Sequence, residues 1–136
     1  MIEYHEAWLL IADDDLRIAE VVLRQDDPIT GGAVYHTQQC AEKALKGFLA
    51  FKRAEIHKIH DLAELVVQCA EFDPEFKTLL SDAAILTPKA TKFRYPESYT
   101  GLVDPSQLFP DVEEVEEAII KAKRILDFVK AKIHGE

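Results

Sequence analysis

The chain has 136 residues, enough for one domain with a sizeable core over residues 1–136, and an ordinary globular balance of 48% apolar and 30% charged residues. Its net charge of −9 argues against general binding to nucleic acid, which depends on clustered Lys and Arg, so no DNA partner is expected. No apolar run approaches the length of a membrane span and no secretory signal is evident, which predicts a cytoplasmic protein without a membrane partner.

Two amphipathic helices are predicted in the first part of the chain, over about residues 3–24 and 32–53. The first has an apolar residue at every third or fourth position, which is typical of a helix with one buried face. Asp26, Asp27 and Pro28 end it, and a Gly-Gly pair leads into the second helix. The apolar positions of the first helix are Trp8, Ala12, Leu16, Ala19 and Leu23.

Two further helical segments complete the predicted fold. The third begins at Asp61, which can cap its first turn, and restarts at Asp73-Pro74 with Asp as the cap and Pro as the first helical residue. The last follows Asp111 and keeps an apolar seam as far as Ile133. Four such helices, with no competing strand pattern, predict an all-α, up-down-up-down four-helix bundle with an interrupted third helix.

Residues 87–110 separate the third and last helical segments and are expected to form a long loop. They contain four prolines, too many for a continuous helix, yet they are too apolar and aromatic for a free linker. Long connections with their own aromatic anchors often serve function in small domains. We therefore expect this loop to pack back on the bundle.

The second predicted helix carries a polar stripe opposite its apolar face. His36, Gln39, Lys43 and Lys46 follow one another on this stripe, and no carboxylate is expected between them. An imidazole, an amide and two ammonium groups in line would suit a nucleotide, RNA or a protein partner. The alternative interpretation is an ordinary solvated helix face.

Three short motifs together resemble the prokaryotic HEPN domain. Residues 35–46 read YHTQQCAEKALK, residues 60–62 read HDL, and residues 93–96 read FRYP. The resemblance extends from about Glu6 to Lys132. It implies a compact helical bundle, frequent homodimerisation and a link to nucleotides or RNA. It also implies a small nucleotidyltransferase as a partner, in a system of the toxin–antitoxin type.

The same resemblance identifies Arg94 as the principal candidate for a binding site. HEPN ribonucleases have an Arg followed a few residues later by a His that moves the proton, and Arg94 matches the Arg. Tyr99 stands where the His is expected, and a phenol with a pKa near 10 is a poor proton shuttle. Arg94 can bind phosphate or carboxylate, or it can instead pair with an acid of the bundle. The predicted ligand-binding residues are Arg94, Lys43, His36, Gln39, Tyr95, Tyr99 and His60.

Other candidate sites are given structural interpretations. Arg53 and His60 have a similar spacing but lie at the wrong place, and His60 is expected to support the start of the third segment. His57 and His60 lack further metal ligands, and the carboxylates of residues 13–15 point apart along a helix, where a solvated face is expected. No metal or cofactor is predicted. Cys40 and Cys69 are predicted to be reduced core thiols.

Three functions compete on these grounds. The first is a HEPN module with little or no catalysis that dimerises, binds nucleotide or RNA and partners a nucleotidyltransferase. The second is a metal-independent endoribonuclease toxin with a degenerate site, and the third is a structural dimerisation unit. Dimerisation is also favoured by Tyr35, Leu49 and Phe51, which extend beyond one apolar stripe of the second helix.

Overall fold

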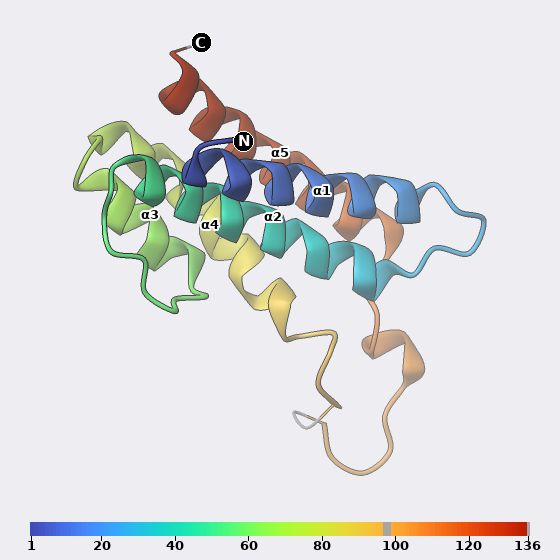
Figure 1. Cartoon of the computed structure of the whole chain (residues 1–136). Helices are drawn as coiled ribbons and strands as arrows, with labels where there is room; N and C mark the ends of the chain where they lie inside the picture. Colours follow the sequence, from blue (N-terminus) through green and yellow to red (C-terminus); the bar gives the residue numbers. More distant parts are fainter. Residues whose placement is uncertain (97–98, 136) are drawn as a thin grey trace.

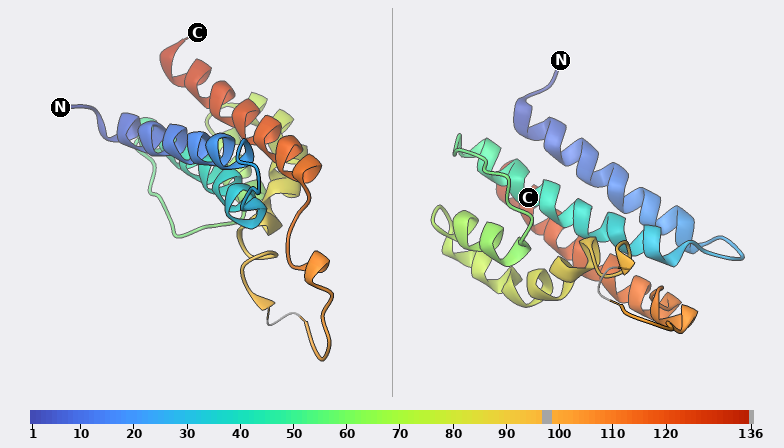
Figure 2. Two further views of the ribbon diagram at one scale, coloured as in Figure 1. Left: turned by 90° about the vertical axis from the view of Figure 1, so that its right-hand side faces the viewer. Right: turned by 90° about the horizontal axis from the view of Figure 1, so that it is seen from below.

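The computed structural model, described for residues 1–96 and 99–135, is an all-helical bundle, as predicted (Figure 1). Three long helices, α1 (Tyr4–Leu23), α2 (Thr30–Phe51) and α5 (Val112–His134), lie side by side (Figure 2). The shorter α3 (Leu62–Ala70) and α4 (Leu80–Leu86) pack beside them. The 3-10 segments are η1 (Pro74–Leu79), η2 (Thr87–Ala90) and η4 (Pro105–Gln107). No helix in the described ranges is long and apolar enough to cross a membrane.

Helices α1 and α2 cross closely enough to require a glycine at their contact. A Cβ atom at Gly47 of α2 would lie only 3.1 Å from Cβ of Trp8 in α1, which is tighter than nine in ten such contacts. The α5 helix then runs antiparallel to α1, because Glu6 contacts His134 near one end and Asp13 contacts Lys130 farther along. The two ends of the chain therefore lie at the same end of the bundle (Figure 1).

The predicted interruption at Asp73-Pro74 is confirmed, and the chain turns back at this point. Oδ1 of Asp73 accepts a hydrogen bond from the Glu75 amide, which caps η1. The Leu62 amide at the start of α3 donates to Oγ1 of Thr87, just beyond the end of α4, over 3.1 Å. Helices α3 and α4 thus form an antiparallel hairpin, in which α3 packs mainly on α2 and α4 packs mainly on α5.

Aromatic side chains join this hairpin to the long helices. The Phe76 ring of η1 is fully buried, with its centre 4.3 Å from that of Phe48 in α2 and 4.9 Å from that of Phe128 in α5. Aliphatic residues of all five helices belong to the same hydrophobic core. The surplus apolar surface expected on α2 is absent at Leu49, which is buried, and at Phe51, which packs against the core. That part of the argument for dimerisation is wrong.

The two cysteines lie in the core as free thiols, as predicted. Burial raises the pKa of Cys69 to about 12 because the thiolate would lose its hydration. Burial also raises the pKa of Cys40 far above its ordinary value, and the nearby carboxylates of Asp15 and Asp13 add to the effect. Neither thiol is suited to nucleophilic chemistry.

The loop between α4 and α5 extends beyond the end of the bundle instead of packing back along its length (Figures 1 and 2). Phe93 packs against the core, whereas Tyr95 and Phe109 are more than half exposed and Leu102 is fully exposed. The expectation that the loop packs back on the bundle therefore holds at Phe93 and Arg94, which contact the core and Tyr35, and fails for the exposed part of the loop. Its prolines and short 3-10 turns direct the chain outward, and its aromatic residues anchor only the parts nearest the bundle.

Candidate functional site

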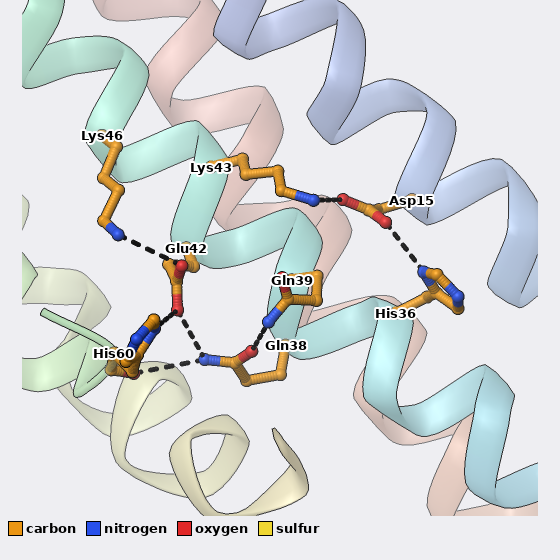
Figure 3. Close-up of polar contacts among 8 residues, drawn as sticks. All are labelled: Asp15, His36, Gln38, Gln39, Glu42, Lys43, Lys46 and His60. Atoms are coloured by element: carbon orange, nitrogen blue, oxygen red, sulfur yellow. Dashed lines mark hydrogen bonds and ion pairs between the residues drawn. The ribbon is translucent and has the colours of Figure 1, made fainter. Parts of the chain in front are cut away.

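A carboxylate of α1 joins two residues of the predicted polar stripe (Figure 3). Oδ1 of Asp15 lies 2.8 Å from Nδ1 of His36, and Oδ2 accepts a hydrogen bond from Nζ of Lys43 over 2.7 Å. Asp15 is only 5% exposed, so the solvated-face interpretation is wrong for this residue. The reason lies in its position: it follows Ala12 by three residues and precedes Ala19 by four, which places it on the buried face of α1.

A second carboxylate gathers the remaining stripe residues into a separate network (Figure 3). Glu42 of α2 is 5% exposed and accepts hydrogen bonds from Nζ of Lys46 over 3.2 Å and from Nε2 of Gln38 over 3.3 Å. Its Oε1 also lies 3.0 Å from Nδ1 of His60. Gln39 donates to Oε1 of Gln38 and so joins the same network.

The predicted stripe is therefore not one continuous binding face. It consists of an Asp15 cluster and a Glu42 network, and the expectation of a stripe free of carboxylates is wrong. The predicted supporting role of His60 is confirmed, because its carbonyl also accepts a hydrogen bond from Gln38 and this holds the start of α3 against α2. Arg53, which follows α2 with a φ of 57°, forms no ion pair within the described part of the chain.

The loop places Arg94 on the aromatic ring that precedes His36. Cζ of Arg94 lies 4.0 Å from the centre of the Tyr35 ring, a distance at which a guanidinium and an aromatic face attract each other. The ring centre of His36 also lies 5.3 Å from that of Tyr35, in an edge-to-face arrangement. Arg94 is exposed, and the described residues provide no carboxylate within ion-pair distance of it. Pairing with an acid of the bundle is thus unsupported there.

Arg94 lies between two open pockets. The larger, about 630 Å³, is bounded by Phe93, Phe109 and the α1–α2 link, including Gly31 in the first turn of α2. The residue before α2 is Ile29, which offers no capping side chain, so the first amides of this helix lack one source of hydrogen bonds. The first turn of α2 and the Arg94 guanidinium border the same space, which favours an anionic ligand, and the carboxylate of Asp27 on the same pocket lowers that preference.

The smaller pocket, about 170 Å³, brings together the three predicted site residues of the loop. Arg94, Tyr95 and Tyr99 all line it. The Tyr99 hydroxyl donates a hydrogen bond to the carbonyl of Gln107 over 2.9 Å, which fixes the ring beside η4. The hydroxyl proton is therefore directed at the protein backbone.

The described ranges contain no group of three or more His, Cys, Asp and Glu side chains able to hold a metal ion. His57 and His60 accordingly acquire no further metal ligands there. Three residues that matter most to the geometry, Asp15, Tyr35 and Glu42, are absent from the predicted site. Asp15 carries a signal in the sequence as a charged residue at an apolar position of its helix, and Tyr35 and Glu42 lie within the motif of residues 35–46.

Comparisons with known proteins agree with this architecture. The model of the HEPN domain matches residues 5–132. A protein of Methanocaldococcus jannaschii named "Putative toxin MJ1304" is 30% identical over 142 residues, which cover 95% of this chain and 88% of that protein.

Two crystal structures share the fold. The protein TT1696 from Thermus thermophilus superposes with a TM-score of 0.82 at 29% identity, covering 96% of this chain and 99% of that one. ST0689, described as an archaeal HEPN homologue, gives a TM-score of 0.74 at 30% identity and covers 97% and 99% of the two chains. With a matching family model over nearly its whole length and relatives of the same size, this chain belongs to the HEPN domain family.

Proposed function

We propose that this HEPN protein is a component of a toxin–antitoxin type system and that it binds the phosphate groups of RNA or of a nucleotide through Arg94. The toxin role rests on the similarity to the named archaeal relative. The observation that supports phosphate binding is the position of Arg94: exposed, stacked on Tyr35 and bordering a pocket with the first turn of α2. Of the other predicted ligand-binding residues, Tyr95 and Tyr99 line the smaller pocket beside Arg94. His36 and Lys43 belong to the Asp15 cluster, and Gln39 and His60 belong to the Glu42 network.

The stacking contact favours phosphate binding by Arg94 over the role of a freely moving surface charge. A guanidinium resting on an aromatic face keeps its N–H groups in one plane, directed outward around the edge of the ring. Less conformational entropy is then lost when these groups bind a phosphate. The net charge of −9 opposes any polyanion, so we expect affinity in the micromolar range.

Removing the Arg94 guanidinium should weaken the binding of single-stranded RNA by about 1.5–3 kcal/mol, roughly a 10- to 150-fold increase in Kd. The loss comes from charge-assisted hydrogen bonds that alanine cannot form. Fluorescence anisotropy with a labelled RNA and with a labelled nucleotide measures the effect of Arg94→Ala on each ligand.

Arg53→Ala provides the matched control, because it removes an arginine charge at the opposite end of α2. A general loss of electrostatic attraction would affect both variants alike. Equal Kd values for Arg94→Ala and the wild type would refute the assignment of the phosphate contact to this residue. Arg94→Lys is expected to recover only part of the affinity, since lysine keeps the charge but not the planar fork.

We further propose that the protein acts in the cytoplasm as a homodimer with a nucleotidyltransferase as partner. The buried free thiols suit a reducing compartment. Exposed apolar side chains on α1 (Leu10 and Ile11) and on the loop (Leu102 and Phe109) would be covered by a second subunit or by the partner.

Self-association is expected to depend on the exposed apolar residues of α1. The wild type should sediment as a dimer at tens of micromolar, and Leu10→Asp with Ile11→Asp should shift it towards the monomer because charges would be placed in an apolar contact. Analytical ultracentrifugation measures both species. A wild-type protein that remains monomeric over this range would contradict the proposal.

A further inference from the structure

We infer that the larger pocket beside Arg94 selects guanosine nucleotides and that Asp27 is the residue that sets this specificity. The inference rests on the proposed binding of phosphate at Arg94 and adds the base that the phosphate carries. It starts from a charge that phosphate binding does not explain. Asp27 lies on the same pocket as Arg94, where its carboxylate repels the phosphate that the guanidinium attracts.

The two opposite charges of this pocket do not pair with each other. Within residues 1–96 and 99–135, neither the Asp27 carboxylate nor the Arg94 guanidinium forms an ion pair or a side-chain hydrogen bond. A ligand that offered only an anion would bind Arg94 and be repelled by Asp27. A ligand with an anionic group at one end and N–H donors at the other would satisfy both side chains.

Two phenyl rings give the same pocket an aromatic lining. Phe93 and Phe109 both border it and both approach Gly31 in the first turn of α2. A Cβ atom at Gly31 would lie 3.8 Å from Cδ1 of Phe109 and 3.9 Å from Cβ of Phe93, and glycine leaves that position open. Phe109 is 58% exposed, so a ligand can still cover its ring. A flat aromatic body gains most from such a surface, because it can stack on it.

The size of the pocket agrees with a ligand that joins these groups. Its volume of about 630 Å³ falls within the usual range of small-molecule sites. A nucleoside monophosphate combines an anion, a flat ring and an edge of hydrogen-bonding groups in one molecule. Each of these parts has a counterpart among Arg94, the phenyl rings and Asp27.

Guanine has the base edge that a carboxylate accepts best. Its N1–H and one N–H of its 2-amino group lie side by side, so each can donate to one oxygen of the carboxylate, as in an arginine–carboxylate pair. Adenine and cytosine have an amino group beside a ring nitrogen that is itself an acceptor. Uracil has one N–H between two carbonyl oxygens. An acceptor facing a carboxylate is repelled, so these three bases satisfy Asp27 less well.

The local sequence restricts Asp27 and supplies a matched control beside it. Asp27 precedes Pro28, and a proline ring limits the backbone conformations of the residue before it. Less conformational freedom is then lost when the carboxylate binds a base. Asp26 has the same charge one position earlier in the chain and does not line the pocket.

Isothermal titration of the purified full chain with GMP, IMP and AMP tests the selection, because IMP differs from GMP only in the missing 2-amino group. We expect GMP to bind about tenfold more tightly than AMP, with IMP between them, as for a contact with two hydrogen bonds that the other ligands form in part. Equal Kd values for the three nucleotides, together with a loss of binding in Arg94→Ala, would overturn this inference and leave the proposed function intact. Failure to bind any of them or RNA would refute both.

Asp27→Asn should change the affinities for two ligands in opposite directions. The amide keeps one acceptor and turns a donor towards the N–H groups of guanine, so GMP should bind about tenfold more weakly. AMP should bind as tightly as before or more tightly, because the charge that repels its phosphate is gone. A folding defect would weaken both. Asp26→Asn removes the same charge outside the pocket and should keep the preference for GMP. A preference for GMP that persists in Asp27→Asn would contradict the role of Asp27.

Discussion

Replacing Phe76 with alanine should lower the free energy of unfolding by about 3–5 kcal/mol, a large part of the stability of a small domain. Phe76 is fully buried, and its ring touches those of Phe48 and Phe128. Alanine would leave a cavity where the α3–α4 hairpin, α2 and α5 meet. The short 3-10 segment that carries Phe76 cannot easily move to fill it, because Asp73 caps one end and α4 follows the other. Urea unfolding followed by circular dichroism measures the change.

Phe72→Ala is the matched control for this prediction. Phe72 lies in the turn that precedes the same segment, but 46% of its surface is exposed. Its loss should cost about 0.5 kcal/mol or less. If both variants lost similar stability, the hairpin would be held by its turn and not by the aromatic cluster around Phe76.

The helices and their boundaries could be predicted because their signals are local. Asp61, Asp73 and Asp111 each accept a hydrogen bond from an amide two or three residues ahead, and each begins a helical segment where the sequence indicated. The direction of the chain after Asp73-Pro74 could not be predicted in the same way. A cap followed by proline is compatible with a restart in either direction, and the reversal is decided by distant contacts such as that between Leu62 and Thr87.

Distant contacts also limit how much of the candidate site can be predicted from the sequence. A short motif identifies Arg94, but its contact with Tyr35 depends on how the loop returns to the bundle. The helical pattern places His36 in a stripe on α2, yet its partner is Asp15 on another helix. A helical wheel shows which residues share a face of one helix and does not show which face of a second helix lies opposite. The pairing of His36 with Asp15 and its proximity to Arg94 therefore emerge only in three dimensions.

The separation of the stripe into two clusters also assigns different tasks to residues that look alike in sequence. Lys43 and Lys46 are one turn apart on α2, and both form ion pairs with carboxylates. Lys43 is 24% exposed beside His36, whose side chain is 30% exposed, whereas the side chain of Lys46 is only 8% exposed. The Asp15 cluster can thus reach a ligand, and the Glu42 network mainly holds α2 against the start of α3. Mutations in the Asp15 cluster should therefore affect the proposed ligand binding, whereas mutations in the Glu42 network should affect stability.

Glu42→Gln should therefore destabilise the fold by about 3 kcal/mol, because it leaves the buried ammonium of Lys46 without a counter-charge. The change is isosteric and keeps an oxygen that can accept hydrogen bonds from Gln38 and His60, so the lost charge accounts for most of the effect. Adding Lys46→Met should recover at least half of the lost stability, since the second change removes the unpaired charge and fills the space with an apolar chain. Urea unfolding of the two single variants and the double variant measures this coupling.

Asp127→Asn is the control that tests whether burial of the ion pair causes the loss of stability in Glu42→Gln. Asp127 pairs with Lys123 at the same four-residue spacing on α5, but more than half of each side chain is exposed. Water and salt screen such a pair, so its loss should cost about 0.5 kcal/mol or less. A cost for Glu42→Gln as small as this would mean that water reaches Lys46 in solution. In that case the start of α3 is held to α2 by Gln38 and the backbone carbonyl of His60, with little contribution from charge.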